Sequence, residues 1–168
     1  EDETVDEAGF RRLLRRVLDA GVHGVVVLGT AGEFATLADE QKARAIEVVV
    51  SEVAGQVPVI AVTGEPGTRR AVAMTRRAAR LGADAAMVVP PYYHPLNNAG
   101  VLAHYRALLQ AGDLPVVLYN IPGCTKVTID LGVACELASE PAIIGIKDSG
   151  GNFGYFQSLV QRLPAGLG

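Results

Sequence analysis

The sequence predicts an α/β fold with a parallel sheet, and it favours a (β/α)8 TIM barrel over a doubly wound open sheet. Short apolar runs alternate with amphipathic segments along the whole 168-residue chain. Polar residues follow the apolar runs at their carboxyl ends, which a barrel gathers on one rim. No GxGxxG turn follows the first apolar run, and no Walker lysine is present, which disfavours the nucleotide-binding open sheets.

Helices and strands are predicted from the spacing of the apolar residues. Five apolar residues at helical spacing, opposite a face of arginines, indicate a first helix: Phe10, Leu13, Leu14, Val17 and Leu18. Runs rich in apolar and β-branched residues indicate buried strands at 23–30, 57–64, 83–93, 114–122 and 142–149. Further helices are expected at about 37–54, 68–81, 98–111, 130–139 and 154–163.

The ends of these helices carry recognisable capping residues. Four helices run into a glycine just before the next strand, where a left-handed residue closes a helix: Gly21, Gly55, Gly82 and Gly112. Thr36 with Asp39, and separately Asp130, are predicted to cap helix N-termini. The repeating unit of helix, glycine, link and strand predicts a parallel sheet with right-handed crossovers.

The length of the chain restricts the barrel interpretation. A complete (β/α)8 barrel takes about 250 residues, whereas residues 1–168 hold about five predicted strands and six predicted helices. Either the chain is part of a barrel, or its sheet does not close.

Composition excludes several classes of protein. The net charge of −3 and the pI near 5.6 give no electrostatic reason to expect nucleic acid or a membrane as partner. No apolar run is long enough to span a bilayer, and no signal peptide pattern is present. Cys124 and Cys135 form no CxxC pair, which predicts neither a disulfide framework nor a zinc site and fits a reducing cytoplasm.

Lys147 is the strongest candidate for chemistry. It stands in AIIGIKDSGG (142–151), an apolar strand in which we expect burial to lower the pKa of its ammonium. The free amine can then attack a carbonyl and form a Schiff base. The alternative is a buried salt bridge with Asp148 or Glu33, although neighbours on a strand point to opposite faces, which disfavours Asp148. Lys42 and Lys126 are predicted to be solvated.

Two further segments place candidate groups at the same rim. Tyr119 ends the preceding strand, where its phenol can move protons, or can be a core aromatic with a satisfied hydroxyl. GTAGE (29–33) is a turn whose backbone N–H groups can bind a carboxylate, or whose glycines serve only the turn. In that turn Thr30 adds a hydroxyl, and Glu33 can equally be an N-terminal charge of the next helix.

The loop PPYYHP (90–95) brings two aromatic residues and a histidine to the predicted rim, for function or for packing. The three histidines, His23, His94 and His104, have no metal-ligand spacing, so we expect no metal. The arginine-rich helices are predicted to be solvated outer faces.

Four motifs in this order resemble the dihydrodipicolinate synthase / N-acetylneuraminate lyase family: GTAGE, PPYY, YNIP (119–122) and GIKDSGG (145–151). The resemblance covers essentially all 168 residues. It implies a (β/α)8 barrel that forms Schiff bases with pyruvate or related 2-oxo acids without metal or cofactor. It also implies that the family's first strand precedes Glu1 and that two strands and a helical region follow Gly168.

The resemblance assigns roles to single residues. Lys147 is implied as the Schiff-base lysine and Tyr119 as the proton-transferring tyrosine. Thr30 is implied in the hydroxyl relay and, with Gly29 and Ala31, in holding the substrate carboxylate. Tyr93 is implied to reach into the site of a neighbouring subunit, in a homotetramer built as a dimer of dimers.

Two positions depart from the family pattern. Ala31 stands where a second hydroxyl residue is common, so one side-chain contact to the carboxylate is lost. Cys124 stands where the synthases have an arginine that binds the carboxylate of aspartate semialdehyde, and Lys126 lacks the bidentate fork of that arginine. These departures keep other aldehydes open as the second substrate.

The predicted function is therefore that of a metal-free Schiff-base lyase or synthase acting on pyruvate or a related 2-oxo acid and an aldehyde. Condensation of the dihydrodipicolinate synthase kind is one alternative. Cleavage by an aldolase of the 4-hydroxy-2-oxoglutarate type is another, and aldol cleavage or dehydration of a keto-deoxy sugar acid is a third. An alternative of a different class is a barrel that binds 2-oxo acids without turnover.

Overall fold

The computed structural model, which describes residues 4–168, contains one parallel sheet with the strand order β1-β2-β3-β4-β5. The strands are β1 (Val25–Val27), β2 (Val59–Val62), β3 (Ala85–Val88), β4 (Val116–Asn120) and β5 (Ile143–Asp148). Each strand pairs with the next one along the chain. A doubly wound sheet reverses its order part-way, so this order confirms the barrel-type winding.

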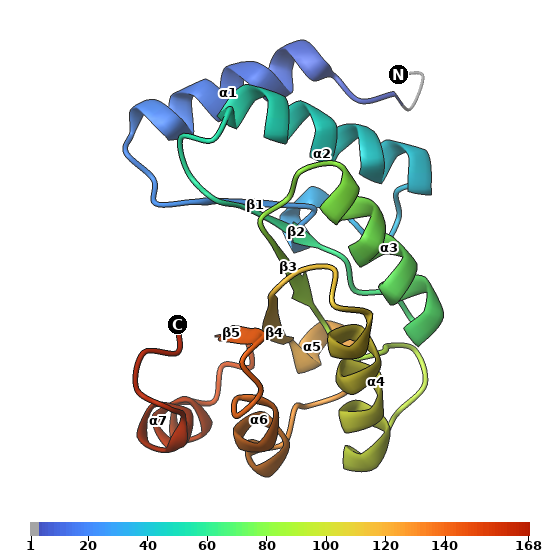
Figure 1. Ribbon diagram of the computed structural model, residues 1–168, viewed down its shortest axis with the longest axis vertical. Coiled ribbons are helices and arrows are strands. Elements are labelled where there is room, and N and C mark those ends of the chain that lie inside the picture. The colour runs from blue at the N-terminus through green and yellow to red at the C-terminus, as the bar shows by residue number, and fades with distance from the viewer. Residues whose placement is uncertain (1–3) are drawn as a thin grey trace.

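Six helices lie where the sequence predicts them, and two short ones were not predicted. The six are α1 (Glu7–Asp19), α2 (Asp39–Val53), α3 (Thr68–Arg80), α4 (Asn98–Ala111), α6 (Leu131–Leu137) and α7 (Phe153–Arg162). The short ones are η1 (Thr30–Gly32) and α5 (Pro122–Thr125), which follow β1 and β4. Helices α1 to α4, α6 and α7 surround the strands on three sides in Figure 1, leaving the fourth open.

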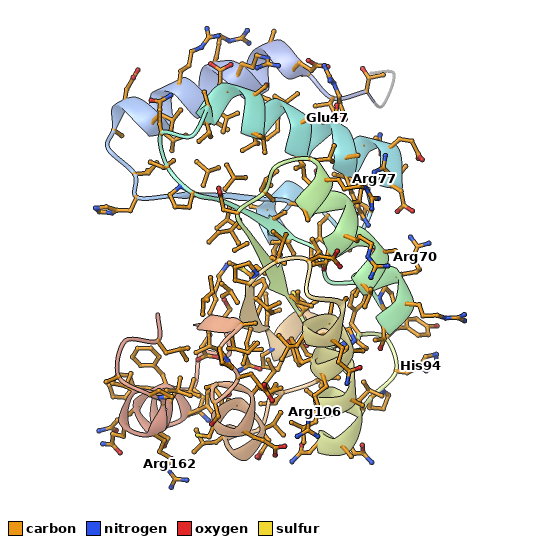
Figure 2. The ribbon with its side chains drawn as sticks, viewed as in Figure 1. Glu47, Arg70, Arg77, His94, Arg106 and Arg162 are labelled. Carbon is orange, nitrogen blue, oxygen red and sulfur yellow. The ribbon has the colours of Figure 1, made fainter. Side chains whose placement is uncertain are left out.

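The arginine-rich faces point outward, as predicted. Figure 2 shows Arg70, Arg106 and Arg162 on the outer side of α3, α4 and α7. The first helix differs in one position: Leu14 is buried, but Leu13 is 59% exposed and does not belong to the covered face.

The helix ends confirm most of the capping predictions. All four glycines, Gly21, Gly55, Gly82 and Gly112, have the left-handed backbone conformation. Asp130 caps α6 by accepting a hydrogen bond from the Gly132 N–H at 2.8 Å. The prediction for α2 was wrong, because Ala38 occupies the cap position and the Thr36 hydroxyl donates to the Glu33 carbonyl.

Lys42 is buried rather than solvated, which corrects the prediction from sequence. Its Nζ lies 2.5 Å from the Glu65 carboxylate, and both side chains are at most 7% exposed. Arg70 reaches the other oxygen of Glu65 at 3.4 Å. The pair joins α2 to the residue three positions after β2, so the charge that Lys42 carries on the buried face of α2 is balanced by a residue from another segment.

Replacement of Lys42 by alanine is expected to lower the free energy of unfolding by about 3 kcal/mol or more, because a buried carboxylate loses its main counter-charge. Arg70, 3.4 Å from the other oxygen of Glu65, replaces the lost counter-charge only in part. Urea unfolding of the full-length protein measures the loss. Arg44→Ala, which breaks the exposed pair with Glu7, is the matched control and should cost less than about 1 kcal/mol. Equal effects of the two substitutions would contradict the prediction.

His104 is a buried histidine that joins α4 to α3. Its Nδ1 lies 2.9 Å from the Thr68 hydroxyl, and its Nε2 is buried with no hydrogen-bond partner among the described residues. Burial lowers the pKa of His104 to about 4. The folded protein therefore holds this imidazole neutral in a pH range where the unfolded chain protonates it.

Stability is expected to fall as the pH drops from about 6.5 toward about 4, because only the unfolded state gains the proton of His104 in this window. The shift corresponds to about 3 kcal/mol over the whole window. Urea unfolding at pH 7 and pH 5 measures the slope, which should be shallower in His104→Gln. His23→Gln, at an exposed histidine, is the control. A slope identical in wild type and His104→Gln would refute the assignment.

Candidate active site

Tyr119 and Lys147 lie side by side at the carboxyl ends of β4 and β5. The register pairs Tyr119 with Lys147 and Asn120 with Asp148. The Lys147 Nζ lies 4.2 Å from the centroid of the Tyr119 ring. A cation at this distance over an aromatic face is attracted by the ring. The sheet therefore brings together the two groups that the sequence singled out.

Thr30 follows β1, at the opposite edge of the sheet, and also reaches this pair. Its hydroxyl lies 3.2 Å from the Tyr119 hydroxyl, although the two residues are 89 positions apart. The residue before the turn, Leu28, is buried and has a positive φ of 64°, which is uncommon for a non-glycine residue and marks local strain. The strand end and turn thus hold Thr30 against the phenol.

The Tyr119 phenol has an altered acidity. The Tyr119 residue is only 2% exposed, and burial by itself raises the pKa of a phenol. Hydrogen bonds with Thr30, Lys147 and Ser149, together with the charge of Lys147, outweigh burial and lower the pKa of Tyr119 below its usual value of about 10. A more acidic phenol gives and takes protons more readily near neutral pH.

Lys147 is exposed among residues 4–168, so these residues by themselves do not give it the burial that we expected. β5 pairs with β4 on one side, and on its other side the described chain supplies only backbone hydrogen bonds with Gly168. The exposed Ile144, on the same strand, and Val26, on β1, show that the first and last strands are both partly uncovered. An apolar sequence cannot desolvate a side chain where no neighbour covers it.

Asp148 does not pair with Lys147. Its carboxylate accepts a hydrogen bond from the Asn120 side-chain amide at 2.7 Å and another from the Gly150 N–H at 3.1 Å. Among the described residues, Lys147 forms no salt bridge, either with Asp148 or with Glu33. The salt-bridge alternative for the lysine is therefore not supported.

Asn120 is a site residue to which the sequence reasoning gave no role, although it lies at the carboxyl end of a predicted strand. Its side chain is buried, donates to Asp148, and accepts from the Ile129 N–H at 3.0 Å. The backbone carbonyl of Asn120 also accepts a hydrogen bond from the Ser149 N–H. Asn120 thus ties the end of β4 to β5 and to the segment before α6. A polar residue directly after Tyr119 in a buried strand was the available signal.

The GTAGE turn forms η1, in which the N–H groups of Gly32 and Glu33 bond back to Gly29 and Thr30. The N–H groups at the start of such a turn have no partner within it. Those of Thr30 and Ala31 are therefore the donors that can face a carboxylate. Ala31 is exposed and adds no side-chain donor.

Tyr93 lies apart from the other three predicted residues. It is 82% exposed, has a positive φ of 80°, and stacks edge-on against His94, which Figure 2 marks in the loop before α4. No contact joins Tyr93 to Tyr119 or Lys147 among the described interactions.

A hollow of about 290 Å³ opens beside Thr30, and we call it the rim pocket. The pocket is bounded by the loops that follow β1, β3 and β4. Its lining includes Thr30, Glu33, Phe34, Tyr92, Ile121 and Cys124. Cys124 and Cys135 are free thiols, as the sequence predicted.

A model of the dihydrodipicolinate synthetase family matches residues 1–168. The chain belongs to this family. The 4-hydroxy-tetrahydrodipicolinate synthase of Stenotrophomonas maltophilia (strain R551-3) is 48% identical over 160 residues, which are 95% of this chain and 54% of that protein. The enzyme of the same name from Exiguobacterium sibiricum is 42% identical over 163 residues, 97% of this chain and 56% of that protein.

Solved structures of the dihydrodipicolinate synthetase family share the fold. The crystal structure of the dihydrodipicolinate synthase from Acinetobacter baumannii complexed with pyruvate has a TM-score of 0.94 and 37% identity. The match covers 97% of this chain and 56% of that chain. This chain therefore spans about half the length of the family members that it matches. In residues 4–168, no helix is long and apolar enough to cross a membrane, and no group of three or more His, Cys, Asp and Glu side chains is placed to hold a metal ion.

Proposed function

We propose that this chain provides the Schiff-base centre of a pyruvate-dependent lyase that condenses a 2-oxo acid with an aldehyde. One observation carries the proposal: the Lys147 amine lies over the Tyr119 ring, and the Tyr119 hydroxyl in turn contacts Thr30. A nucleophile, a proton-transferring phenol and a second hydroxyl thus meet at one rim. Family membership and the relatives named 4-hydroxy-tetrahydrodipicolinate synthase support the same reaction class.

The first half of the reaction uses Lys147 and Tyr119. The Lys147 nitrogen attacks the keto carbon of pyruvate with its lone pair, and one proton passes from that nitrogen to the carbonyl oxygen to give a carbinolamine. Tyr119 supplies a proton to the departing hydroxyl, which leaves as water, and the lysine nitrogen is left in an iminium bond. The Thr30 hydroxyl contacts the Tyr119 hydroxyl and relays protons to it.

The second half forms the carbon–carbon bond. The iminium acts as an electron sink, so the pyruvate methyl group loses a proton to the Tyr119 phenolate that dehydration left, and an enamine forms. The enamine carbon attacks the aldehyde carbon, the iminium forms again, and the aldehyde oxygen takes the proton from Tyr119 to become a hydroxyl. Water then hydrolyses the iminium, which releases the product and regenerates the Lys147 amine. The same steps in reverse cleave a hydroxy-oxo acid.

The remaining predicted residues have supporting roles in the proposal. The turn at Gly29, Thr30 and Ala31 binds the pyruvate carboxylate through backbone N–H groups and orients the keto carbon. Tyr93, exposed on a strained loop, completes the site of a second copy in a homo-oligomer, a tetramer in the form that the family resemblance implies.

Residues 1–168 form part of a barrel whose other strands cover Val26, Ile144 and Lys147. The cytoplasmic location stays a prediction.

Trapping with borohydride tests the proposed function. The full-length protein is incubated with pyruvate and sodium borohydride, which reduces the iminium to a stable amine. Mass spectrometry of the digested protein is expected to locate the added group on Lys147. Absence of an adduct with pyruvate and with every other 2-oxo acid tried would refute the Schiff-base mechanism. A stable adduct with no turnover of any aldehyde would instead favour the non-catalytic binding protein.

A further inference from the structure

We propose that Asn120 is a positioning residue, whose hydrogen bond to Asp148 fixes the distance between the two reacting side chains of this centre. These are Tyr119 and Lys147, so the inference rests on the proposed function. Asn120 directly follows Tyr119 in β4, and Asp148 directly follows Lys147 in β5. The contact between Asn120 and Asp148 therefore links the two strands one position beyond the reacting pair.

The pairing of β4 with β5 is irregular, so something has to fix the register at its carboxyl end. One residue of β5, Ile144, is skipped between the pairs that Val116 and Val117 form. A strand that slips by one residue turns each of its side chains to the other face of the sheet. Such a slip at the carboxyl end of β5 would take the Lys147 amine away from the phenol on β4.

The side-chain amide of Asn120 holds both strand ends and the segment before α6. The residue is 1% exposed. The amide nitrogen donates to the Asp148 carboxylate at 2.7 Å, and the amide oxygen accepts from the Ile129 N–H at 3.0 Å. Because an unpaired polar group is costly to bury, this amide favours the one register in which both of its ends have partners. The backbone carbonyl of Asn120 adds a bond from the Ser149 N–H at 2.8 Å.

The Asp148 carboxylate is held on its side as well. The oxygen that accepts from Asn120 also accepts from the Gly150 N–H at 3.1 Å. A Cβ atom on Gly150 would lie 3.1 Å from that oxygen and 3.4 Å from the Asn120 nitrogen, so the chain closes tightly over the contact. Neighbours on a strand point to opposite faces. Asn120 therefore acts on Tyr119 and Lys147 through the strands, and not by touching the substrate.

Exchange of the two partners tests the inference in the full-length protein. Asn120→Asp keeps the shape of the side chain but sets a second carboxylate against Asp148. We expect kcat to fall about 10²-fold, which is the cost of a displacement of about 1 Å between reacting groups. The double variant Asn120→Asp with Asp148→Asn again pairs an amide with a carboxylate, so kcat should recover at least about tenfold from the single variant. KM for pyruvate should change little in either, because the turn proposed to bind its carboxylate follows another strand, β1.

Two further variants separate positioning from a general loss of structure. Asp148→Ala removes the acceptor from the less buried side of the contact, and it should lower kcat about tenfold whether or not Asn120→Asp folds. Tyr155→Phe is the matched control. The Tyr155 hydroxyl donates to the Ile129 carbonyl, in the segment that Asn120 also holds, so this variant loosens the same segment but keeps the link between β4 and β5. Its kcat should equal that of wild type.

Single-turnover trapping with pyruvate and borohydride gives a second readout. The adduct on Lys147 should form slowly in Asp148→Ala and at the wild-type rate in Tyr155→Phe. A wild-type kcat in Asp148→Ala, an equal loss in Tyr155→Phe, or a double variant that does not recover although its circular dichroism spectrum matches wild type would overturn the inference. An adduct absent even from the wild-type protein defeats the proposed function, whereas rapid adduct formation in every variant defeats only the role of Asn120.

Discussion

Lys147→Ala is expected to lower kcat of the full-length protein by at least about 10⁴-fold, in line with removal of a covalent nucleophile. The physical reason is that no other amine lies over the Tyr119 ring among the described residues. Without an iminium the pyruvate methyl group has no electron sink, so the enamine does not form. Steady-state pyruvate consumption measures the loss, and borohydride should leave the variant without adduct.

The control for Lys147→Ala is Lys126→Ala, at a second exposed lysine. Lys126 bonds only to the Gly123 carbonyl among the described contacts, so its loss should not change kcat. Because Lys147 forms no salt bridge among the described residues, its removal breaks no ion pair there, and the unfolding midpoint should stay close to that of wild type. An active Lys147→Ala variant would show that another residue carries the chemistry.

Tyr119→Phe is expected to lower kcat by about 10²- to 10⁴-fold, the range in which a positioned acid–base group contributes. The ring that lies beside Lys147 is kept, while the hydroxyl that meets Thr30 is removed. The lysine can then still attack, but carbinolamine dehydration lacks its proton donor. Single-turnover trapping should therefore show slow formation of the adduct rather than its absence.

The pH profile separates a chemical role of Tyr119 from a structural one. Because hydrogen bonds and Lys147 lower the pKa of Tyr119, the alkaline limb of kcat should fall below the pH at which an ordinary phenol ionises. That limb should be absent in Tyr119→Phe. Tyr105→Phe is the matched control: Tyr105 is a buried tyrosine whose hydroxyl donates to the Val88 carbonyl. It should cost about 1 kcal/mol of stability and leave the pH profile of kcat unchanged.

Local signals in the sequence were sufficient to predict the longer helices, the strands and the parallel order of the strands. Helical periodicity and closing glycines located the six longer helices, and apolar runs located the five strands, because both depend on residues a few positions apart. The short helices η1 and α5 were missed, since three or four residues carry no period. The carboxyl ends of parallel strands meet at one edge, so the pairing of Tyr119 with Lys147 also followed from the winding.

Other features depended on contacts between residues far apart in the chain. Thr30 meets Tyr119 across 89 positions, and Asn120 meets Asp148 across 28. Lys42 lies on the buried face of α2, and the partner that balances its charge, Glu65, is 23 positions away.

The sequence by itself determined the parallel α/β winding, the rim on which the candidate residues lie, and the family motifs that name Lys147 and Tyr119. Only the tertiary structure decided which charges residues 4–168 cover: they bury Lys42 and leave Lys147 exposed. Periodicity states which face of an element a residue occupies, whereas desolvation depends on what packs against that face.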